Sequence, residues 1–142
     1  MRFELLTLSG TKFDGDVKEV SLRTTNGQLG ILPHHEHLTA IVVAGPVVVN
    51  PEHGRTQVFA TFGGMLEVSP DHTRLLADEA EHLDELVEKQ IETALEHAQR
   101  LKEKAKDKTE LAKAQALVDR HEVRLGVARM HRRHQERPGE RT

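Results

Sequence analysis

The sequence contains no cysteine, no tryptophan and no tyrosine, and it has only four phenylalanines. Without cysteine, disulfides, thiolate metal sites and cysteine nucleophiles are all excluded. No apolar run approaches the roughly 20 residues that a membrane helix needs. The N-terminal stretch MRFELLTLSG is too short, and alternates too much, for a signal peptide. These absences predict a protein that is made and kept in a reducing, soluble compartment.

The net charge and the absence of certain motifs exclude or disfavour further classes of protein. The formal net charge is -3, so the overall charge does not suggest nucleic acid as a partner. There is no Gly-x-x-x-x-Gly-Lys-Ser/Thr phosphate loop and no Gly-x-Ser-x-Gly nucleophile elbow. A mean hydropathy of -0.54 is low for a chain that buries one compact core. Part of the molecule is therefore expected to be thin and exposed to solvent.

The first half of the chain is typical of β-structure. Eight of the ten glycines and all four phenylalanines precede residue 78. Short β-type runs separated by turn residues, with no helical pattern between them, indicate an antiparallel sandwich or barrel. The apolar stretch AIVVAGPVVV, residues 40–49, is expected to lie between the two sheets. The predicted strands are 3–8, 17–24, 28–32, 38–43, 47–50, 57–62, 65–69 and 73–77.

The second half is typical of helices. It is rich in Ala, Leu, Glu, Lys and Arg, which are strong helix formers. Apolar or small residues recur at a period near 3.5 and predict helices over 83–106 and 109–134. The predicted seam consists of Leu83, Val87, Ile91, Ala94, Ala98, Leu101 and Ala105 on the first helix, and Leu111, Ala114, Val118, His121, Leu125 and Ala128 on the second. Between them, Asp107 and Glu110 have the spacing of a capping box. So short a connection makes the helices antiparallel neighbours.

The predicted fold class is therefore α+β, with an N-terminal antiparallel β-sandwich over 1–80 and a C-terminal antiparallel helical hairpin over 81–142. The hairpin seam is rich in alanine, so it buries little apolar area and is expected to be only marginally stable.

Charge is sorted along this hairpin. Eight acids and one lysine lie in 78–96, whereas seven arginines and four acids lie in 119–142. Acids at the start of the first helix and bases at the end of the second both suit the helix dipoles. The same pattern also predicts a basic helix end that meets an acidic protein partner. Nucleic-acid binding through the Arg-rich end is a third interpretation, disfavoured because this half has no aromatic residues.

The stretch PHHEH places His34, His35, Glu36 and His37 side by side. Imidazole and carboxylate are the ligands of zinc and iron sites, so one hypothesis is a metal-dependent small β-barrel enzyme that uses these histidines. In an extended chain, however, alternate side chains point to opposite faces, so only two of the four converge. No second cluster with metal-ligand spacing supports the site. A polar loop without metal is the favoured interpretation.

Two motifs in order carry a resemblance to a known family. Gly27–His35 reads GQLGILPHH, of the form G-x-L-G-I-L-P-x-H, and residues 63–68 read GGMLEV, followed by LLAD. Together with VAGPV between them and the closing RLGVARMHRRH, they resemble the epsilon subunit of the F-type ATP synthase. The resemblance extends from about Phe3 to Arg133.

The resemblance implies a non-catalytic rotor subunit of a proton-translocating ATP synthase, not an enzyme. It implies a central-stalk position in contact with the gamma subunit and the c-ring, and association with a membrane only through the complex. It also implies that the hairpin either folds against the sandwich or extends into the alpha/beta catalytic head, where it restrains ATP hydrolysis. With no targeting segment apparent, we expect the cytoplasmic face of a bacterial plasma membrane.

Individual residues follow from the matching motifs. His35 falls on the motif histidine in the rotor-contacting lobe, and Gln28 lies near the edge expected to face the c-ring. The resemblance further implies contacts between a basic second helix and acidic segments of the head. The residues assigned to those contacts are Arg124, Arg129, Arg132 and Arg133.

Some members of the family bind ATP through the motif Ile/Leu-Asp-x-x-Arg-Ala at the start of the first helix. Here the matching stretch is LDELVE, in which Leu83 and Asp84 match. Val87 replaces the arginine and Glu88 replaces the alanine. Losing a guanidinium and gaining a carboxylate both disfavour a polyphosphate. We therefore expect no cofactor, and ATP binding that is absent or weak.

Overall fold

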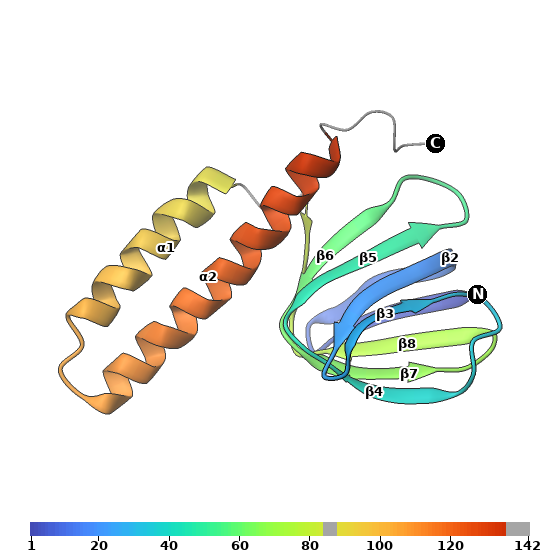
Figure 1. Cartoon of the computed structure of the whole chain (residues 1–142), viewed down its shortest axis with the longest axis horizontal. Helices are drawn as coiled ribbons and strands as arrows, with labels where there is room; N and C mark the ends of the chain where they lie inside the picture. Colours follow the sequence, from blue (N-terminus) through green and yellow to red (C-terminus); the bar gives the residue numbers. More distant parts are fainter. Residues whose placement is uncertain (84–87, 136–142) are drawn as a thin grey trace. The chain divides into compact units, whose positions relative to one another are not determined.

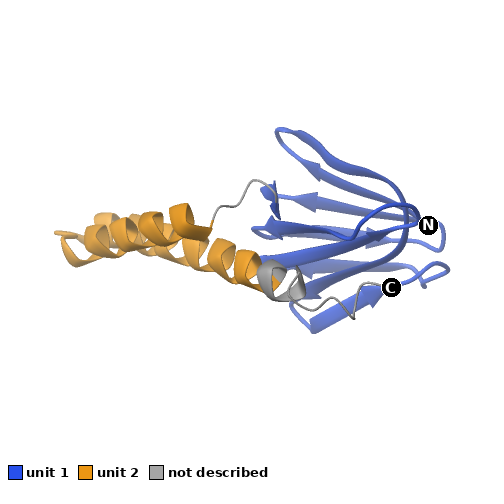
Figure 2. Ribbon diagram, turned by 90° about the horizontal axis from the view of Figure 1, so that it is seen from above, with its two compact units in different colours: residues 1–83 blue, residues 84–142 orange. Residues whose placement is uncertain are grey.

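The computed structural model describes residues 1–83 and 88–135, with side chains up to residue 130. The chain forms two compact units, Met1–Leu83 and Asp84–Thr142, which are coloured separately in Figure 2. The strands are β1 (Arg2–Thr7), β2 (Gly10–Thr24), β3 (Gly27–Ile31), β4 (Leu38–Val42), β5 (Gly45–Pro51), β6 (Gln57–Thr61), β7 (Gly64–Val68), β8 (His72–Ala77) and β9 (Ala80–His82), and the helices are α1 (Glu88–Glu103) and α2 (Lys108–Gln135).

The first unit is the predicted β-sandwich. Its strands follow the order β1-β8-β7-β4-β2-β5-β6-β9, with β3 paired to β2 and an additional pairing between β1 and β2. In Figure 1 one layer holds β6, β5, β2 and β3, and the other holds β8, β7 and β4. Every pairing is antiparallel except β1 with β8, which is parallel. The sandwich and the helical hairpin confirm the predicted fold class.

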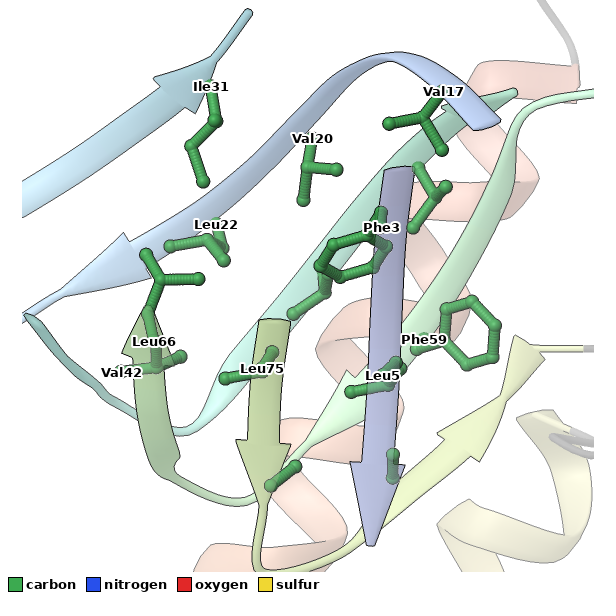
Figure 3. Packing of buried hydrophobic residues seen from close by; sticks show 14 of the residues in the cluster. Phe3, Leu5, Val17, Val20, Leu22, Ile31, Val42, Phe59, Leu66 and Leu75 are labelled. Carbon is green, nitrogen blue, oxygen red and sulfur yellow. The ribbon is translucent and has the colours of Figure 1, made fainter. Parts of the chain in front are cut away.

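Alternating apolar residues fill the space between the layers. Phe3 and Leu5 of β1 are fully buried, as are Leu66 of β7 and Leu75 of β8. Figure 3 shows these side chains of β1, β7 and β8 turned toward a common interior. Because side chains in a strand point alternately to opposite faces, this inward set leaves an outward set on the same strands. That outward set forms the surface described below.

Two strand predictions were wrong in an informative way. β2 begins at Gly10 instead of residue 17, so Asp14 and Asp16 lie within a strand. Arg2 of β1 holds Asp14 with two hydrogen bonds, Nε to Oδ1 at 3.0 Å and Nη2 to Oδ2 at 2.9 Å. Pairing with β1 therefore extends a strand whose own sequence resembles a turn. In addition, the 40–49 stretch is not buried throughout, because Ile41 is 59% exposed.

Gly63 and Gly64, at the start of β7, permit a close backbone approach. A Cβ at Gly64 would overlap the carbonyl oxygen of Leu76 and would lie 2.9 Å from the Cα of Ala77. Gly63 has a φ of 95°, a conformation that side chains disfavour. At these two glycines the start of β7 can lie close to the end of β8, its antiparallel neighbour.

The second unit is a helical hairpin with a capped turn. The Glu110 amide donates to Asp107 Oδ1 at 2.8 Å, which is the first bond of the predicted capping box. The Glu110 side chain accepts at 2.9 Å from the Lys106 amide, one residue before the cap, instead of from the Asp107 amide. Ile91 of α1 packs with Leu125 and Ala128 of α2. α1 ends at Glu103, three residues before the predicted end at 106, whereas α2 covers all of the predicted 109–134 with one more residue at each end.

Candidate docking surfaces

The outer face of β4, β7 and β8 carries a row of exposed apolar side chains. Ile41 pairs with Met65, Met65 pairs with Leu76, and Leu76 pairs with Leu6 of β1 in the strand register. Ile41 is 59% exposed, Met65 48% and Leu76 47%. We call the side chains of Leu6, Ile41, Met65 and Leu76 the apolar row. Apolar side chains aligned across adjacent strands are typical of a surface that another protein covers.

The residues two positions along each strand, on the same face, are polar. Thr39 pairs with Glu67, Glu67 with Arg74, and Arg74 with Glu4. Glu4 also lies 2.8 Å from His72 Nε2 and 3.6 Å from Arg74 Nη2. The face therefore has an apolar stripe beside a charged stripe, the pattern of an interface with an apolar core and a polar rim.

Prediction from sequence missed the apolar row. Ile41, Met65 and Leu76 belong to three separate β-type runs, and no local pattern states which residues face each other across a sheet. The sequence held one weak signal. Ala40 and Val42 face inward, so the position between them faces outward, and it is occupied by the apolar Ile41 where a polar residue would be expected.

A shallow hollow of about 390 Å³ adjoins one end of this row. Residues 24–29, from the end of β2 through most of β3, form one wall. Residues 38–41 of β4, with Met65, form the other. None of the lining residues is charged. Gln28, predicted at a rotor interface, lines this hollow, and its Nε2 donates to Ser21 Oγ at 2.8 Å.

The histidine stretch forms the exposed loop between β3 and β4. His34 has a φ of 68°, and its amide donates to the Pro70 carbonyl at 2.8 Å. His35 is half-buried, with Nδ1 2.7 Å from the Glu36 carbonyl oxygen, whereas the other side chains of the stretch are exposed. Within 1–83 and 88–130, no three His, Asp or Glu side chains are grouped as metal ligands. The geometry gives no support to the metal-enzyme hypothesis.

The predicted head-contacting arginines lie on α2. Arg124 Nη1 is 3.3 Å from His121 Nδ1, and Arg129 forms ion pairs with Glu88 and Glu92 of α1. The backbones of Arg132 and Arg133 continue α2, but their side chains lie outside the described residues. Arg120, one turn before Arg124, has its pKa lowered by burial and by the charge of Arg124.

The two residues of the nucleotide-binding motif are placed differently. Leu83 follows β9 and is buried in the first unit, outside α1 as described. Asp84 lies outside the described residues. Glu88, which stands where the motif has alanine, begins α1 and is engaged by Arg129 at 3.5 Å.

Neither described helix combines the length and the hydrophobicity required to cross a bilayer.

Comparisons with known proteins agree on one family. Residues 1–83 match the model described as ATP synthase, Delta/Epsilon chain, beta-sandwich domain. The chain is 33% identical to the ATP synthase epsilon chain of Bacillus velezensis, over 90% of this chain and 96% of the relative. It is also 33% identical to that of Chloroflexus aggregans, over 93% and 94%.

Among solved structures, a chain of the Euglena gracilis mitochondrial ATP synthase, solved as OSCP/F1/c-ring in rotational state 1, has the same fold. Its TM-score is 0.71 at 21% identity, over 84% of this chain and 76% of that one.

Proposed function

The chain belongs to the family of ATP synthase epsilon chains, and from that premise we propose that its apolar row is the surface that fixes it to the rotor. It is a central-stalk subunit of a rotary ATP synthase, and its partners are the gamma subunit, the c-ring and the catalytic head. As a structural and regulatory subunit, it transmits rotation by staying bound, so its chemistry is that of an interface. We assign no bond-making step to it.

The alignment of Ile41, Met65 and Leu76 carries this proposal. Each side chain is about half exposed, and covering such a side chain contributes on the order of 1 kcal/mol. The adjacent charged stripe, with Glu67 and Arg74, supplies a rim that sets orientation. We assign the gamma subunit to this face. A subunit that turns with the rotor must bind gamma firmly, and this face offers a contact that extends across a whole sheet.

The loop residues extend the same rotor-binding surface. Gln28 and His35 occupy two ends of the β3–β4 region, and His35 is held in place by its bond to the Glu36 carbonyl. We propose that both contact the rotor, through gamma or the c-ring. The domain roles follow, with residues 1–80 as the rotor-binding domain and residues 81–142 as the regulatory domain.

The hairpin restrains ATP hydrolysis in this proposal. Arg124, Arg129, Arg132 and Arg133 meet acidic segments of the alpha/beta head when the hairpin extends. A single exposed ion pair contributes little, but several together bias a two-state element by a few kcal/mol. The complex would place this peripheral subunit at the cytoplasmic face of a bacterial plasma membrane.

A gamma-binding measurement tests the rotor assignment. Met65→Lys puts a charge into the middle of the apolar row and should weaken binding to purified gamma by at least about tenfold, because the ammonium loses its hydration in the interface. Glu67→Gln lies two residues along the same face, makes the same change in net charge, and should alter binding by less than about threefold. Equal binding by Met65→Lys and wild type would refute the assignment.

A further inference from the structure

The sulfur of this chain belongs entirely to methionine. The sequence has three methionines, Met1, Met65 and Met130, and it has no cysteine. Peroxides oxidise thiols and thioethers more readily than other side chains, and they convert methionine into methionine sulfoxide. Because no thiol is present to react first, oxidation of this protein by a peroxide falls on a methionine.

The three methionines differ in their exposure to solvent. Met65 of β7 is 48% exposed and lines the open hollow beside β4. Met1 packs against the core of the first unit, and its Sδ accepts a hydrogen bond at 3.3 Å from the hydroxyl of the fully buried Thr73. Met130 is half-buried on α2. Since oxidation requires that the oxidant reach the sulfur, Met65 is the methionine that reacts first.

The surroundings of Met65 decide what its oxidation does. Met65 occupies the middle of the apolar row, where strand register sets it between Ile41 of β4 and Leu76 of β8. A thioether is apolar and adaptable, whereas a sulfoxide carries a polar oxygen that accepts hydrogen bonds. The side chains of Ile41 and Leu76 have no donor to offer that oxygen. Covering a sulfoxide at this position would therefore bury an unsatisfied polar group.

The free subunit tolerates the same change. The side chain of Met65 points out of the sandwich, whereas its neighbour Leu66 points inward and is fully buried. The sulfoxide oxygen on the free chain is therefore hydrated, and the core is not altered. Oxidation at this position acts on docking and leaves the fold intact.

We propose that Met65 is an oxidation-sensitive modification site, at which a peroxide converts the free subunit into a form that the rotor rejects. The thioether sulfur attacks one oxygen of hydrogen peroxide, an S–O bond forms, the O–O bond breaks, and water leaves. The sulfur loses two electrons and the peroxide gains them. A methionine sulfoxide reductase reverses the step with a dithiol as reductant, again releasing water. This inference rests on the proposed function, since it takes the gamma subunit to cover the apolar row.

Peptide mass spectrometry tests the site itself. When the full-length free chain is treated with increasing hydrogen peroxide, Met65 should gain one oxygen at least about threefold faster than Met1 or Met130. Addition of gamma before the peroxide should slow oxidation of Met65 by at least about tenfold, because the covered sulfur is no longer reached. A free chain in which Met1 or Met130 reacts as fast as Met65 would overturn the assignment.

Gamma binding tests the consequence. Peroxide-treated wild-type chain should bind purified gamma about tenfold more weakly than untreated chain, and sulfoxide reductase should restore the loss. Met65→Leu retains an apolar side chain of similar volume without sulfur, so treatment should change its own binding by less than about twofold. Met130→Leu is the matched control and should lose binding on treatment as the wild type does. An equal loss in treated Met65→Leu would place the sensitive group elsewhere and overturn the proposal.

The inference and the proposed function fail in different ways. If gamma shields Met65 from peroxide but binds its sulfoxide as tightly as the thioether, the rotor assignment stands and the oxidation-sensitive site is refuted. If Met65 reacts equally fast with and without bound gamma, and Met65→Lys leaves gamma binding unchanged, the apolar row is not the gamma surface and both fail.

Discussion

Arg129 Nη2 lies 3.3 Å from Glu92 Oε1, which joins the end of α2 to the first half of α1. The same guanidinium reaches Glu88 one turn earlier, at 3.5 Å. Arg129 is also one of the residues proposed to contact the catalytic head. It cannot serve both sets of carboxylates at once, so contact with the head requires that these pairs break.

Because of this competition, substitutions of Glu92 and of Arg129 should change ATP hydrolysis in opposite directions. Glu92→Gln removes one of the two internal pairs of Arg129 and makes its release from α1 easier, so ATP hydrolysis by the assembled complex should fall by about twofold to fivefold. Arg129→Ala removes the head contact and should raise hydrolysis. The pair is about half exposed, so each effect corresponds to less than about 1 kcal/mol. Lys113→Ala, an exposed cation earlier on α2, is the control, and effects of the same sign in both variants would contradict the competition.

The turn of the hairpin has its own test. Asp107→Ala removes the side chain that accepts from the Glu110 amide, and it should lower the stability of the hairpin by about 1 kcal/mol. Asp107→Ser keeps a capping oxygen and should stay close to wild type. Hydrogen exchange over 88–135 measures the effect, with 1–83 as the internal reference. An Asp107→Ala variant with unchanged exchange would show that packing alone holds the turn.

Gly64→Ala tests the close approach of β7 and β8. The added methyl group meets the backbone of Leu76 and Ala77, which cannot move without breaking strand pairs. We expect a loss of about 1–3 kcal/mol in the free energy of unfolding, measured by urea denaturation. Gly126→Ala is the matched comparison, because nothing lies within 4 Å of its Cβ position in α2, and it should stabilise the helix by up to about 1 kcal/mol. If both substitutions had the same small effect, the close approach would not be a constraint.

ATP binding should be absent or weak. Glu88 stands where the family motif has alanine, and its carboxylate is already paired with Arg129. Calorimetry at millimolar ATP should show no measurable heat of binding. The double variant Val87→Arg with Glu88→Ala restores the motif and should bind measurably more tightly, because it adds a guanidinium at position 87 and removes a repulsive carboxylate at position 88. A tight isotherm for the wild-type chain would contradict the prediction.

Much of the fold was predictable because its signals are local. Alternating residues marked most strands, and Asp107 with Glu110 marked the turn between the helices. The first part of β2 was missed because its pairing partner β1, not its own turn-like sequence, makes it a strand. The apolar row was missed for a related reason: Ile41, Met65 and Leu76 become neighbours only through strand register, which is a long-range property.

The residues predicted to lie between the two helices were likewise only partly predictable from local signals. Ile91, Leu125 and Ala128 are buried as the helical period predicts, whereas Leu101 and Leu111 are 42% and 44% exposed. Periodicity identifies the face of a helix that packs, but it does not show where packing stops. Both exposed leucines lie near the turn, where the helices end.

Truncation from residue 107 onward separates the two roles of the subunit. The first unit has its own buried core and carries the apolar row, so the shortened chain should still assemble with gamma and the c-ring. Loss of α2 removes every proposed head contact, and a coupling of about 1–3 kcal/mol predicts that ATP hydrolysis rises by about fivefold or more. Truncation also exposes Ile91 and Leu95 of α1, so a full-length variant with Arg124, Arg129, Arg132 and Arg133 changed to Gln serves as the second measurement. Both should raise hydrolysis while co-purification with gamma stays intact. Unchanged hydrolysis in both would remove the regulatory role and leave the stalk role standing, because binding to gamma depends on strands that neither variant alters.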